Sequence, residues 1–364
     1  MNYFMPTRLY VGEGSVSAHA TEIAALGNSC LIVCDKVAAS ASGALADIQA
    51  ALEGTSVSYV IWDGVTENPP VASCIEAGEV ATSAQARFVL GVGGGSALDA
   101  AKAISVFAAN PGLSEEAFYQ KAWEADPLPI VLVGTTSGTG SEVTKVSVLT
   151  DKDARKHSIH DDRLFATISL GDARYTRTCP LNVSLSCGVD ILAHATESYF
   201  SKKADEISRA FAVRAIRMAA EPLLLASMEA ELTEEHYDKL YEASILAGLA
   251  INTTGTCFPH NVGYYLTENF GVPHGFASAI FLPDMLELCN ESDLAYASTF
   301  YREIGFSEEA FVRLVDGCIP ELDVAMSKKE VAAALPRWEN NGSVMNTRAD
   351  VSCETIRKIL RNLF

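Results

Sequence analysis

The sequence predicts an α/β domain built on a parallel sheet, followed by an all-α domain, and two observations lead to this fold class. Short apolar runs alternate with helical patterns through residues 1–181. Residues 182–364 carry long helical patterns and little that is typical of a strand. Continuous apolar strands separated by helices indicate a parallel sheet covered on both faces. A chain of 364 residues is long enough for these two domains.

Individual elements follow from the same patterns. In the first domain we expect strands at 30–35, 56–64, 87–95 and 128–136, and helices at 41–53, 71–84 and 96–109. Alternation of this kind predicts a doubly wound arrangement with right-handed crossovers. In the second domain the clearest helical patterns cover 208–226 and 236–251, and the boundary lies near Cys179 and Pro180.

The composition limits the possible partners. The formal charge of −19 disfavours a polyanionic partner such as nucleic acid or an anionic membrane surface. Nine cysteines without a C-x-x-C pair are typical of free thiols in a reducing compartment. Neither a signal-peptide pattern nor an apolar run of membrane-spanning length is present. We therefore expect a cytoplasmic protein that binds neither membranes nor nucleic acid.

A glycine-rich turn, GVGGGSALDAAKAI at 91–104, has the build of a phosphate site. A strand ends in glycines and a helix starts at once, so the backbone can approach a pyrophosphate and the helix N-terminus can donate to it. Ser96 is expected as the N-cap, with Asp99 three residues on. The spacing differs from G-x-G-x-x-G, and a tight turn without a ligand remains the alternative.

Two further segments favour a dinucleotide. TTSGTGSEVT at 135–144 is rich in hydroxyl groups and glycine and follows an apolar strand, although it could be only a capped helix start. Asp35 comes directly after the strand at 30–35. A carboxylate there can accept hydrogen bonds from a ribose 2′-OH and would repel a 2′-phosphate. The alternative for Asp35 is a turn or capping residue.

The stretch CGVDILAHATES at 187–198 places Asp190, His194 and Glu197 on one face of an otherwise apolar helix. A buried carboxylate beside an imidazole is costly unless both groups are satisfied. An ion pair, a capping role for Asp190 or a metal would each satisfy them. His260 and His274 also follow prolines and open apolar helical patterns. One carboxylate with three imidazoles suits Fe²⁺, Zn²⁺ or Ni²⁺.

Taken together, GGGSALDAAKAI, TTSGTGSEVT, GVDILAHATESYFS and the histidine pair at 260 and 274 resemble the iron-containing (group III) alcohol dehydrogenase family as far as about residue 290. The resemblance implies the dehydroquinate synthase-like architecture, in which a Rossmann-like dinucleotide-binding domain (1–181) joins a helical metal-binding and catalytic domain (182–364), with the metal in the cleft between them. It implies as metal ligands Asp190, His194, His260 and His274. It implies as cofactor-binding residues Asp35, Asn68, Gly94, Gly95, Ser96, Asp99, Thr135, Thr136 and Lys156.

What the resemblance implies chemically is an NAD(H)-linked alcohol dehydrogenase or aldehyde reductase for small primary alcohols or aldehydes. Its metal, Fe²⁺ or alternatively Zn²⁺, would polarise the substrate oxygen while hydride passes to or from nicotinamide. NAD is expected over NADP because of Asp35, and a homodimer or larger homo-oligomer is expected. The alternatives are a dehydroquinate-synthase-type or glycerol-dehydrogenase-type enzyme, or an inactive homologue.

One position departs from the family pattern. Many members carry a second histidine four residues after the third ligand, and this chain has Tyr264 there. Its hydroxyl is expected to face the site as a candidate catalytic group, with packing of the ring as the alternative. Glu197 is expected to support a ligand and not to bind the metal itself.

Overall fold

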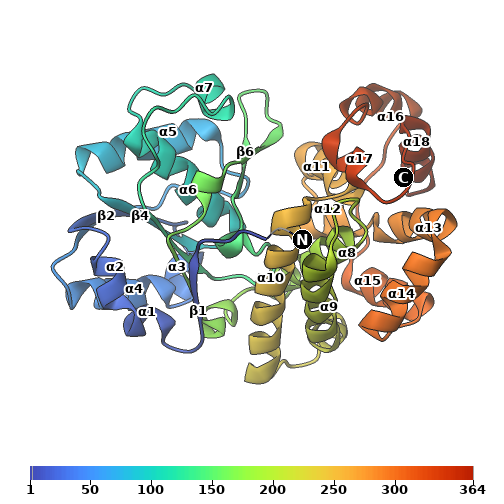
Figure 1. Ribbon diagram of the computed structural model, residues 1–364, viewed down its shortest axis with the longest axis horizontal. Coiled ribbons are helices and arrows are strands. Elements are labelled where there is room, and N and C mark those ends of the chain that lie inside the picture. Colours follow the sequence, from blue (N-terminus) through green and yellow to red (C-terminus); the bar gives the residue numbers. More distant parts are fainter. Residues whose placement is uncertain (2, 364) are drawn as a thin grey trace. The chain divides into compact units, whose positions relative to one another are not determined.

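The computed structural model describes residue 1 and residues 3–363, and these form two compact units. The N-terminal unit comprises Phe4–Pro180. The helical unit begins at Leu181 and includes Met1 and Tyr3. In Figure 1 the N-terminal unit runs from blue to light green and the helical unit continues through yellow to red.

Six parallel strands form the main sheet of the N-terminal unit. Their order is β1–β8–β5–β4–β2–β3. The strands β2 to β5 are those expected from the sequence. Strands β1 and β8 are additional, and with four residues each they are too short for a periodic signal. The bounds are β1 Arg8–Val11, β2 Ser29–Val33, β3 Ser58–Trp62, β4 Phe88–Gly93, β5 Ile130–Gly134 and β8 Ile168–Gly171.

The sheet separates two apolar cores, because successive side chains of a strand point to opposite faces. On β2, Leu31 and Val33 join one core, whereas Cys30 and Ile32 join the other. Helices α5 and α6 cover the first face, and α1 to α4 contribute to the second (Figure 1). The predicted parallel sheet with helices on both faces is thus confirmed. These helices are α1 Ser15–Ala18, α2 Ala20–Ala24, α3 Ala38–Ala41, α4 Ala44–Glu53, α5 Val71–Ser83 and α6 Gly95–Ala109.

A second, antiparallel sheet was not expected from the sequence. It is the hairpin of β6 and β7, in which Thr150 pairs with Lys156. The hairpin joins the loop before α5, because Thr150 forms a parallel bridge with Pro70. The remaining short elements of this unit are β6 Val146–Thr150, β7 Lys156–His160, α7 Glu115–Tyr119, η1 Ser141–Val143, η2 Asp162–Leu164 and η3 Ala173–Thr176.

The chain reverses its direction across the sheet between β2 and β4. From β2 it continues outward to β3, whereas from β4 it continues through α6 to β5 on the other side. In open parallel sheets, ligands bind beyond the carboxyl ends of the strands at such a switch point. This position is where Asp35 and the glycine turn follow their strands.

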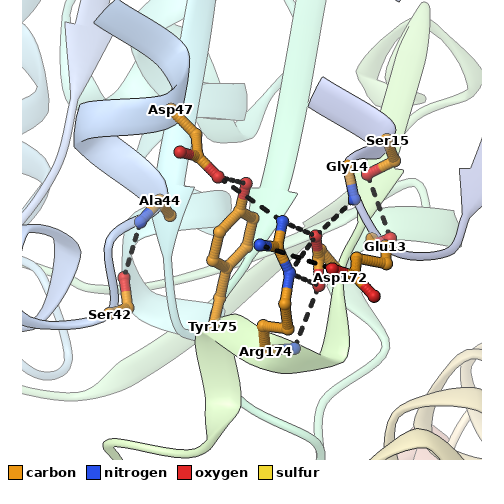
Figure 2. A network of polar contacts seen from close by, with 10 residues as sticks. Glu13, Gly14, Ser15, Ser42, Ala44, Asp47, Asp172, Arg174 and Tyr175 are labelled. Carbon is orange, nitrogen blue, oxygen red and sulfur yellow. Dashed lines mark hydrogen bonds and ion pairs between the residues drawn. The ribbon is translucent and has the colours of Figure 1, made fainter. Parts of the chain in front are cut away.

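A polar network holds the segment that follows β8 (Figure 2). The Arg174 guanidinium donates to both oxygens of Asp172, and the Gly14 amide donates to Asp172 Oδ2 at 2.7 Å. Tyr175 donates to Asp47 Oδ2 of α4 at 2.7 Å. Burial alone would raise the pKa of Asp172, but the Arg174 and Gly14 hydrogen bonds hold it below its usual value. The network fastens η3 to the loop after β1 and to α4.

The helical unit contains helices and one isolated bridge among its described residues, and no helix of the described chain is long and apolar enough to cross a membrane. Its longest helices begin with capping boxes, Asp205 with Ser208 at α9 and Thr233 with His236 at α10. The helices are α8 Leu181–Tyr199, α9 Glu206–Ser227, α10 Glu234–Thr254, α11 Phe258–Phe270, α12 His274–Ala279, α13 Leu282–Ser292, α14 Leu294–Ile304, α15 Glu308–Cys318, α16 Lys328–Ala334, η4 Leu335–Arg337, α17 Gly342–Asn346 and α18 Cys353–Leu363.

Candidate active site

Helix α8 presents three polar side chains on its buried face. Asp190, His194 and Glu197 follow the i, i+4, i+7 spacing of one helical face, and all three are buried. The helix is otherwise apolar here, with Ile191 and Leu192 fully buried in the core of the helical unit. Burying a carboxylate and an imidazole in such surroundings requires specific partners for both.

Helices α11 and α12 bring two histidines to the same place. His260 lies in the first turn of α11, behind a proline, and His274 is the first residue of α12, after Pro273. A Cβ at Gly275 would lie 1.8 Å from the Ser186 carbonyl oxygen of α8. Only glycine therefore allows α12 to approach α8 this closely, and this contact brings His274 to the buried face of α8.

The predicted ligands converge in the structure. Asp190, His260 and His274 each offer a ligand atom, and these atoms lie within 4.8 Å of one another. His260 Nε2 is 3.3 Å from Asp190 Oδ1. His194 is not part of that three-residue group but lies beside it, with its Nδ1 3.7 Å from Asp190 Oδ2 and its ring stacked on His260 at 4.5 Å.

The charges of this cluster act on one another. Burial alone would raise the pKa of Asp190, but the positive charges of His194, His274 and His260 hold it well below its usual range. Burial alone would lower the pKa of His260, whereas Glu197 and Asp190 raise it to about 10. Asp190 is therefore a carboxylate at neutral pH, the form that a metal ligand needs.

The residues fit a divalent cation. Asp190 Oδ1 and His260 Nε2 are buried, face each other, and make no hydrogen bond with any residue that the structure describes. Buried polar atoms nearly always have a partner, so two such atoms together indicate a ligand between them. A carboxylate oxygen with imidazole nitrogens is a donor set suited to Fe²⁺ or Zn²⁺.

Glu197 supports the cluster from behind. One of its carboxylate oxygens, Oε1, makes a short contact with His260 Nδ1, and Oε2 accepts the amide of Cys257 at 2.6 Å. A carboxylate on the far nitrogen of a ligating histidine fixes the ring's tautomer and orientation. Here it leaves His260 Nε2 directed at Asp190, which agrees with the supporting role expected for Glu197.

Tyr264 lies one turn after His260 on α11. Its ring is half-buried and stacks on the His274 ring, with centroids 5.5 Å apart and an interplanar angle of 27°. The side chain is therefore at the ligand cluster, as the helical spacing predicts.

In the N-terminal unit, the glycine turn after β4 packs closely against the loop that follows β5. Gly93 has φ +147°, and a Cβ on Gly95 would lie 2.6 Å from Thr139 Cγ2. The Thr135 amide donates to the Gly93 carbonyl at 2.9 Å, and the Thr136 side chain lies against Gly94. The predicted glycine turn in 91–104 and the hydroxyl-rich segment 135–144 thus meet at the N-terminus of α6.

Ser96 differs from its expected role. Helix α6 begins at Gly95 with Gly94 as N-cap, so the prediction of Ser96 as N-cap is wrong. Its hydroxyl instead accepts the amide of Asn68 at 3.2 Å. Thr150 donates to the Asn68 carbonyl at 2.8 Å and pairs with Lys156. The hairpin, which the sequence did not reveal, thus brings Lys156 to the same edge as Asn68 and Ser96.

Asp99 belongs to a hydrogen-bond network that the sequence did not predict. Its Oδ1 accepts from Ser141 at 2.6 Å and its Oδ2 accepts the Val148 amide at 2.9 Å. Lys102, fully buried, donates to Ser141 Oγ and to the Val146 carbonyl, both at 2.7 Å. The only signal in the sequence is a lysine three residues after Asp99 on an apolar helix. The network fastens the 135–144 loop to α6.

Asp35 takes the turn role, and its second carboxylate oxygen faces the glycine turn. Its Oδ1 accepts the amides of Val37 and Ala38 at 2.8 and 2.5 Å, which is the turn role. Its Oδ2 lies 3.6 Å from the position of a Cβ on Gly93 and so faces the glycine turn. One carboxylate oxygen thus shapes the turn while the other remains beside the predicted cofactor position.

A parallel sheet with a glycine turn at its switch point and a buried Asp/His cluster together are typical of a metal-dependent, dinucleotide-linked alcohol oxidoreductase. Comparison with known proteins identifies the family. Residues 6–173 match the family model for iron-containing alcohol dehydrogenase, and residues 184–317 match the C-terminal model of the Fe-containing alcohol dehydrogenase family. The chain belongs to the iron-containing alcohol dehydrogenase family.

Individual proteins similar to this chain are alcohol dehydrogenases. The chain is 31% identical over 327 residues to long-chain-alcohol dehydrogenase 1 of Geobacillus thermodenitrificans, covering 87% of this chain and 81% of the relative. It is 32% identical over 286 residues to 1,3-propanediol dehydrogenase of Citrobacter freundii, covering 78% and 73%. An iron-containing alcohol dehydrogenase from Thermotoga maritima superposes with a TM-score of 0.92 at 33% identity, covering 100% of this chain and 99% of that one.

The family membership settles the class of function. The protein is a metal-dependent alcohol oxidoreductase, and the cofactors that its family implies are iron and NAD. These relatives are dehydrogenases, which disfavours the synthase-type and inactive alternatives.

Proposed function

We propose that the protein interconverts small primary alcohols and their aldehydes with NAD(H), using a metal held by Asp190, His194, His260 and His274. The observation that carries this proposal is that Asp190, His260 and His274 each bring a ligand atom within 4.8 Å of the others. Two of these residues have a buried atom, Asp190 Oδ1 and His260 Nε2, that makes no hydrogen bond among the described residues. When bound, the metal supplies a Lewis acid for the substrate oxygen, and nicotinamide supplies the hydride acceptor or donor.

The chain's own residues orient the metal ligands and the substrate oxygen. Glu197 holds His260 by its Nδ1, so the ring presents Nε2 toward Asp190. We assign to Tyr264, which stacks on His274, the donation of a hydrogen bond to the substrate oxygen. A phenol suits this role because its hydroxyl both donates and accepts.

The proposed cofactor site is the switch-point edge of the sheet, and the domain roles follow from it: 1–181 for the dinucleotide and 182–364 for the metal. Gly94 and Gly95 at the start of α6 would take the pyrophosphate on backbone amides. Asp35 would accept the ribose hydroxyls and exclude a 2′-phosphate, so NAD is preferred over NADP. Around them we place Asn68, Ser96, Asp99, Thr135, Thr136 and Lys156.

The proposed substrate class follows from the relatives. The relatives' names range from methanol to long-chain alcohols, so we propose only a primary alcohol or aldehyde. The test is a series of aldehydes of increasing chain length with NADH, on protein reconstituted separately with Fe²⁺ and Zn²⁺. NADH oxidation that requires the added metal supports the proposal. Failure of every aldehyde, or equal turnover without metal, would contradict it.

We further propose a homodimer or larger assembly in a reducing cytoplasm. The nine cysteines are all free, which suits a reducing compartment. Light scattering after size exclusion measures the assembly, and a mass of one chain would contradict the oligomer.

A further inference from the structure

The segment Asn346–Arg348, at the end of α17, lies against the chain that leads into the metal-binding helix α11. It belongs to the part of the chain beyond residue 317, which neither family model covers. Asn346 Nδ2 donates to the carbonyls of Thr254 and Thr256 at 2.9 and 3.0 Å. Its Oδ1 accepts the Ser201 hydroxyl at 2.9 Å. The buried side-chain amide of Asn346 thus links the segment after α8 to the segment before α11.

Thr347 reaches the first turn of α11 itself. Its Oγ1 accepts the Phe258 amide at 3.1 Å, and Glu197 Oε2 accepts the preceding amide, that of Cys257. The first amides of a helix lack partners within the helix. Cys257, the N-cap of α11, makes no side-chain cap. Thr347 and Glu197 therefore cap α11 from outside, at the amides two and three residues before His260.

The main chain of the same segment is tied to the end of α8. The Lys202 amide donates to the Asn346 carbonyl at 2.7 Å, and the Arg348 amide donates to the Phe200 carbonyl at 2.8 Å. Thr347 is fully buried and forms an isolated antiparallel bridge with Ser201. The segment therefore spans from the helix of Asp190 and His194 to the turn of His260.

We propose that Asn346 and Thr347 are positioning residues that hold the first turn of α11 against α8 and thereby set the affinity of the metal site. The inference rests on the proposed role of His260 as a ligand. With both residues in place, His260 is ordered before the metal arrives. Without them, binding must also order the turn, and affinity falls by the cost of that ordering.

The test measures Zn²⁺ affinity by competition with a chromophoric chelator, which does not depend on turnover. Thr347→Val keeps the shape of the side chain and removes the acceptor for the Phe258 amide. Supports of ligating residues affect metal affinity by roughly 10–100-fold, and we expect a loss of about tenfold. Thr347→Ser, which keeps the hydroxyl, should restore wild-type affinity.

The matched control lies on the same helix. Thr267 of α11 is buried, and its hydroxyl makes no hydrogen bond among the described residues. Thr267→Val is the same chemical change without a lost cap, so its Zn²⁺ affinity should stay within about twofold of wild type. Equal affinities for Thr347→Val, Thr267→Val and wild type would overturn the proposal, even if the melting temperature of Thr347→Val fell.

Two further variants keep the result decisive. If Thr347→Val fails to fold, Ser201→Ala removes the hydroxyl that donates to Asn346 Oδ1 and to the Thr254 carbonyl and that accepts the Lys203 amide. These contacts tie the same segments together, so a loss of about threefold is expected; unchanged affinity overturns the proposal. His260→Ala tests the premise. If it binds Zn²⁺ like wild type, the proposed ligand set is wrong. If it loses Zn²⁺ while Thr347→Val does not, only the positioning role is wrong.

Discussion

The glycine turn after β4 and the Asp/His cluster of the helical unit are built in opposite ways. The turn uses main-chain groups of residues that are neighbours in sequence, with Gly93 and Gly95 leaving space for a close approach. The cluster uses side chains from three helices, with Asp190 and His260 brought face to face by packing. Backbone amides do not titrate, whereas carboxylates and imidazoles do.

This difference predicts how each region fails. A main-chain site is lost when a side chain fills its space, and its affinity should be nearly independent of pH. A side-chain site is lost when one ligand is removed, and it competes with protons for every ligand.

The largest effect is expected for His260→Ala. Removal of a ligand should weaken Zn²⁺ or Fe²⁺ binding by more than about 100-fold, beyond the range for supporting residues, and should abolish turnover. NADH affinity, measured by fluorescence, should stay unchanged, because the two sites are built independently. Full metal content with near-wild-type turnover would show that His260 is not a ligand.

Metal affinity should rise with pH while NADH affinity stays flat. Glu197 and Asp190 raise the pKa of His260 to about 10, so the metal must displace a proton at neutral pH. Between pH 6 and 8 the Kd for Zn²⁺ should fall by up to about tenfold per unit. Conversely, in metal-free protein this raised pKa contributes stability that is present below pH 6.5 and lost as pH rises toward 10. A Kd independent of pH would contradict the assignment.

Gly95→Ala should weaken NADH binding at the glycine turn and leave the metal cluster unchanged. The added Cβ would lie 2.6 Å from Thr139 Cγ2 and force the 135–144 loop away from α6. Overpacking of this kind costs about 2 kcal/mol, so NADH affinity should fall roughly 30-fold. Metal content, measured by atomic emission, should remain that of wild type. Unchanged NADH affinity would place the cofactor elsewhere.

Asp35→Asn removes the negative charge of the side chain but keeps the shape that the turn requires. Asparagine can still accept the Val37 and Ala38 amides, so the turn should persist. Loss of the negative charge should shift the ratio of kcat/KM for NADP⁺ over NAD⁺ upward by about tenfold. A thermal melt serves as the control for the turn. If the ratio does not move, Asp35 does not select the cofactor.

The smallest effect is expected for Tyr264→Phe. The ring should still stack on His274, so metal content should not change. Loss of one hydrogen bond of about 1–1.5 kcal/mol to the reacting oxygen should lower kcat about fivefold to tenfold. An unchanged kcat and pH profile would assign the ring to packing alone.

Much of the sheet could be predicted because buried parallel strands are continuous apolar runs, and β2 to β5 each have one. Strands β1 and β8 have four residues, and β7 reads KHSIH, so neither length nor apolarity marks them. The N-cap prediction at Ser96 failed for a related reason. A serine at a helix start is attractive locally, but this one is engaged by Asn68 from another loop.

By itself the sequence determined the pieces whose physics is local: the glycine turn, the polar face of α8 and the starts of α11 and α12 at their prolines. Helical period and backbone freedom act over a few residues, so they can be read from order alone. Only the tertiary structure decided which distant groups meet. Glu197 on His260, Lys102 under the 135–144 loop and Thr347 on Phe258 depend on packing between segments far apart in the chain. No local pattern encodes such pairings, because each is one of many contacts that the same residue types could make.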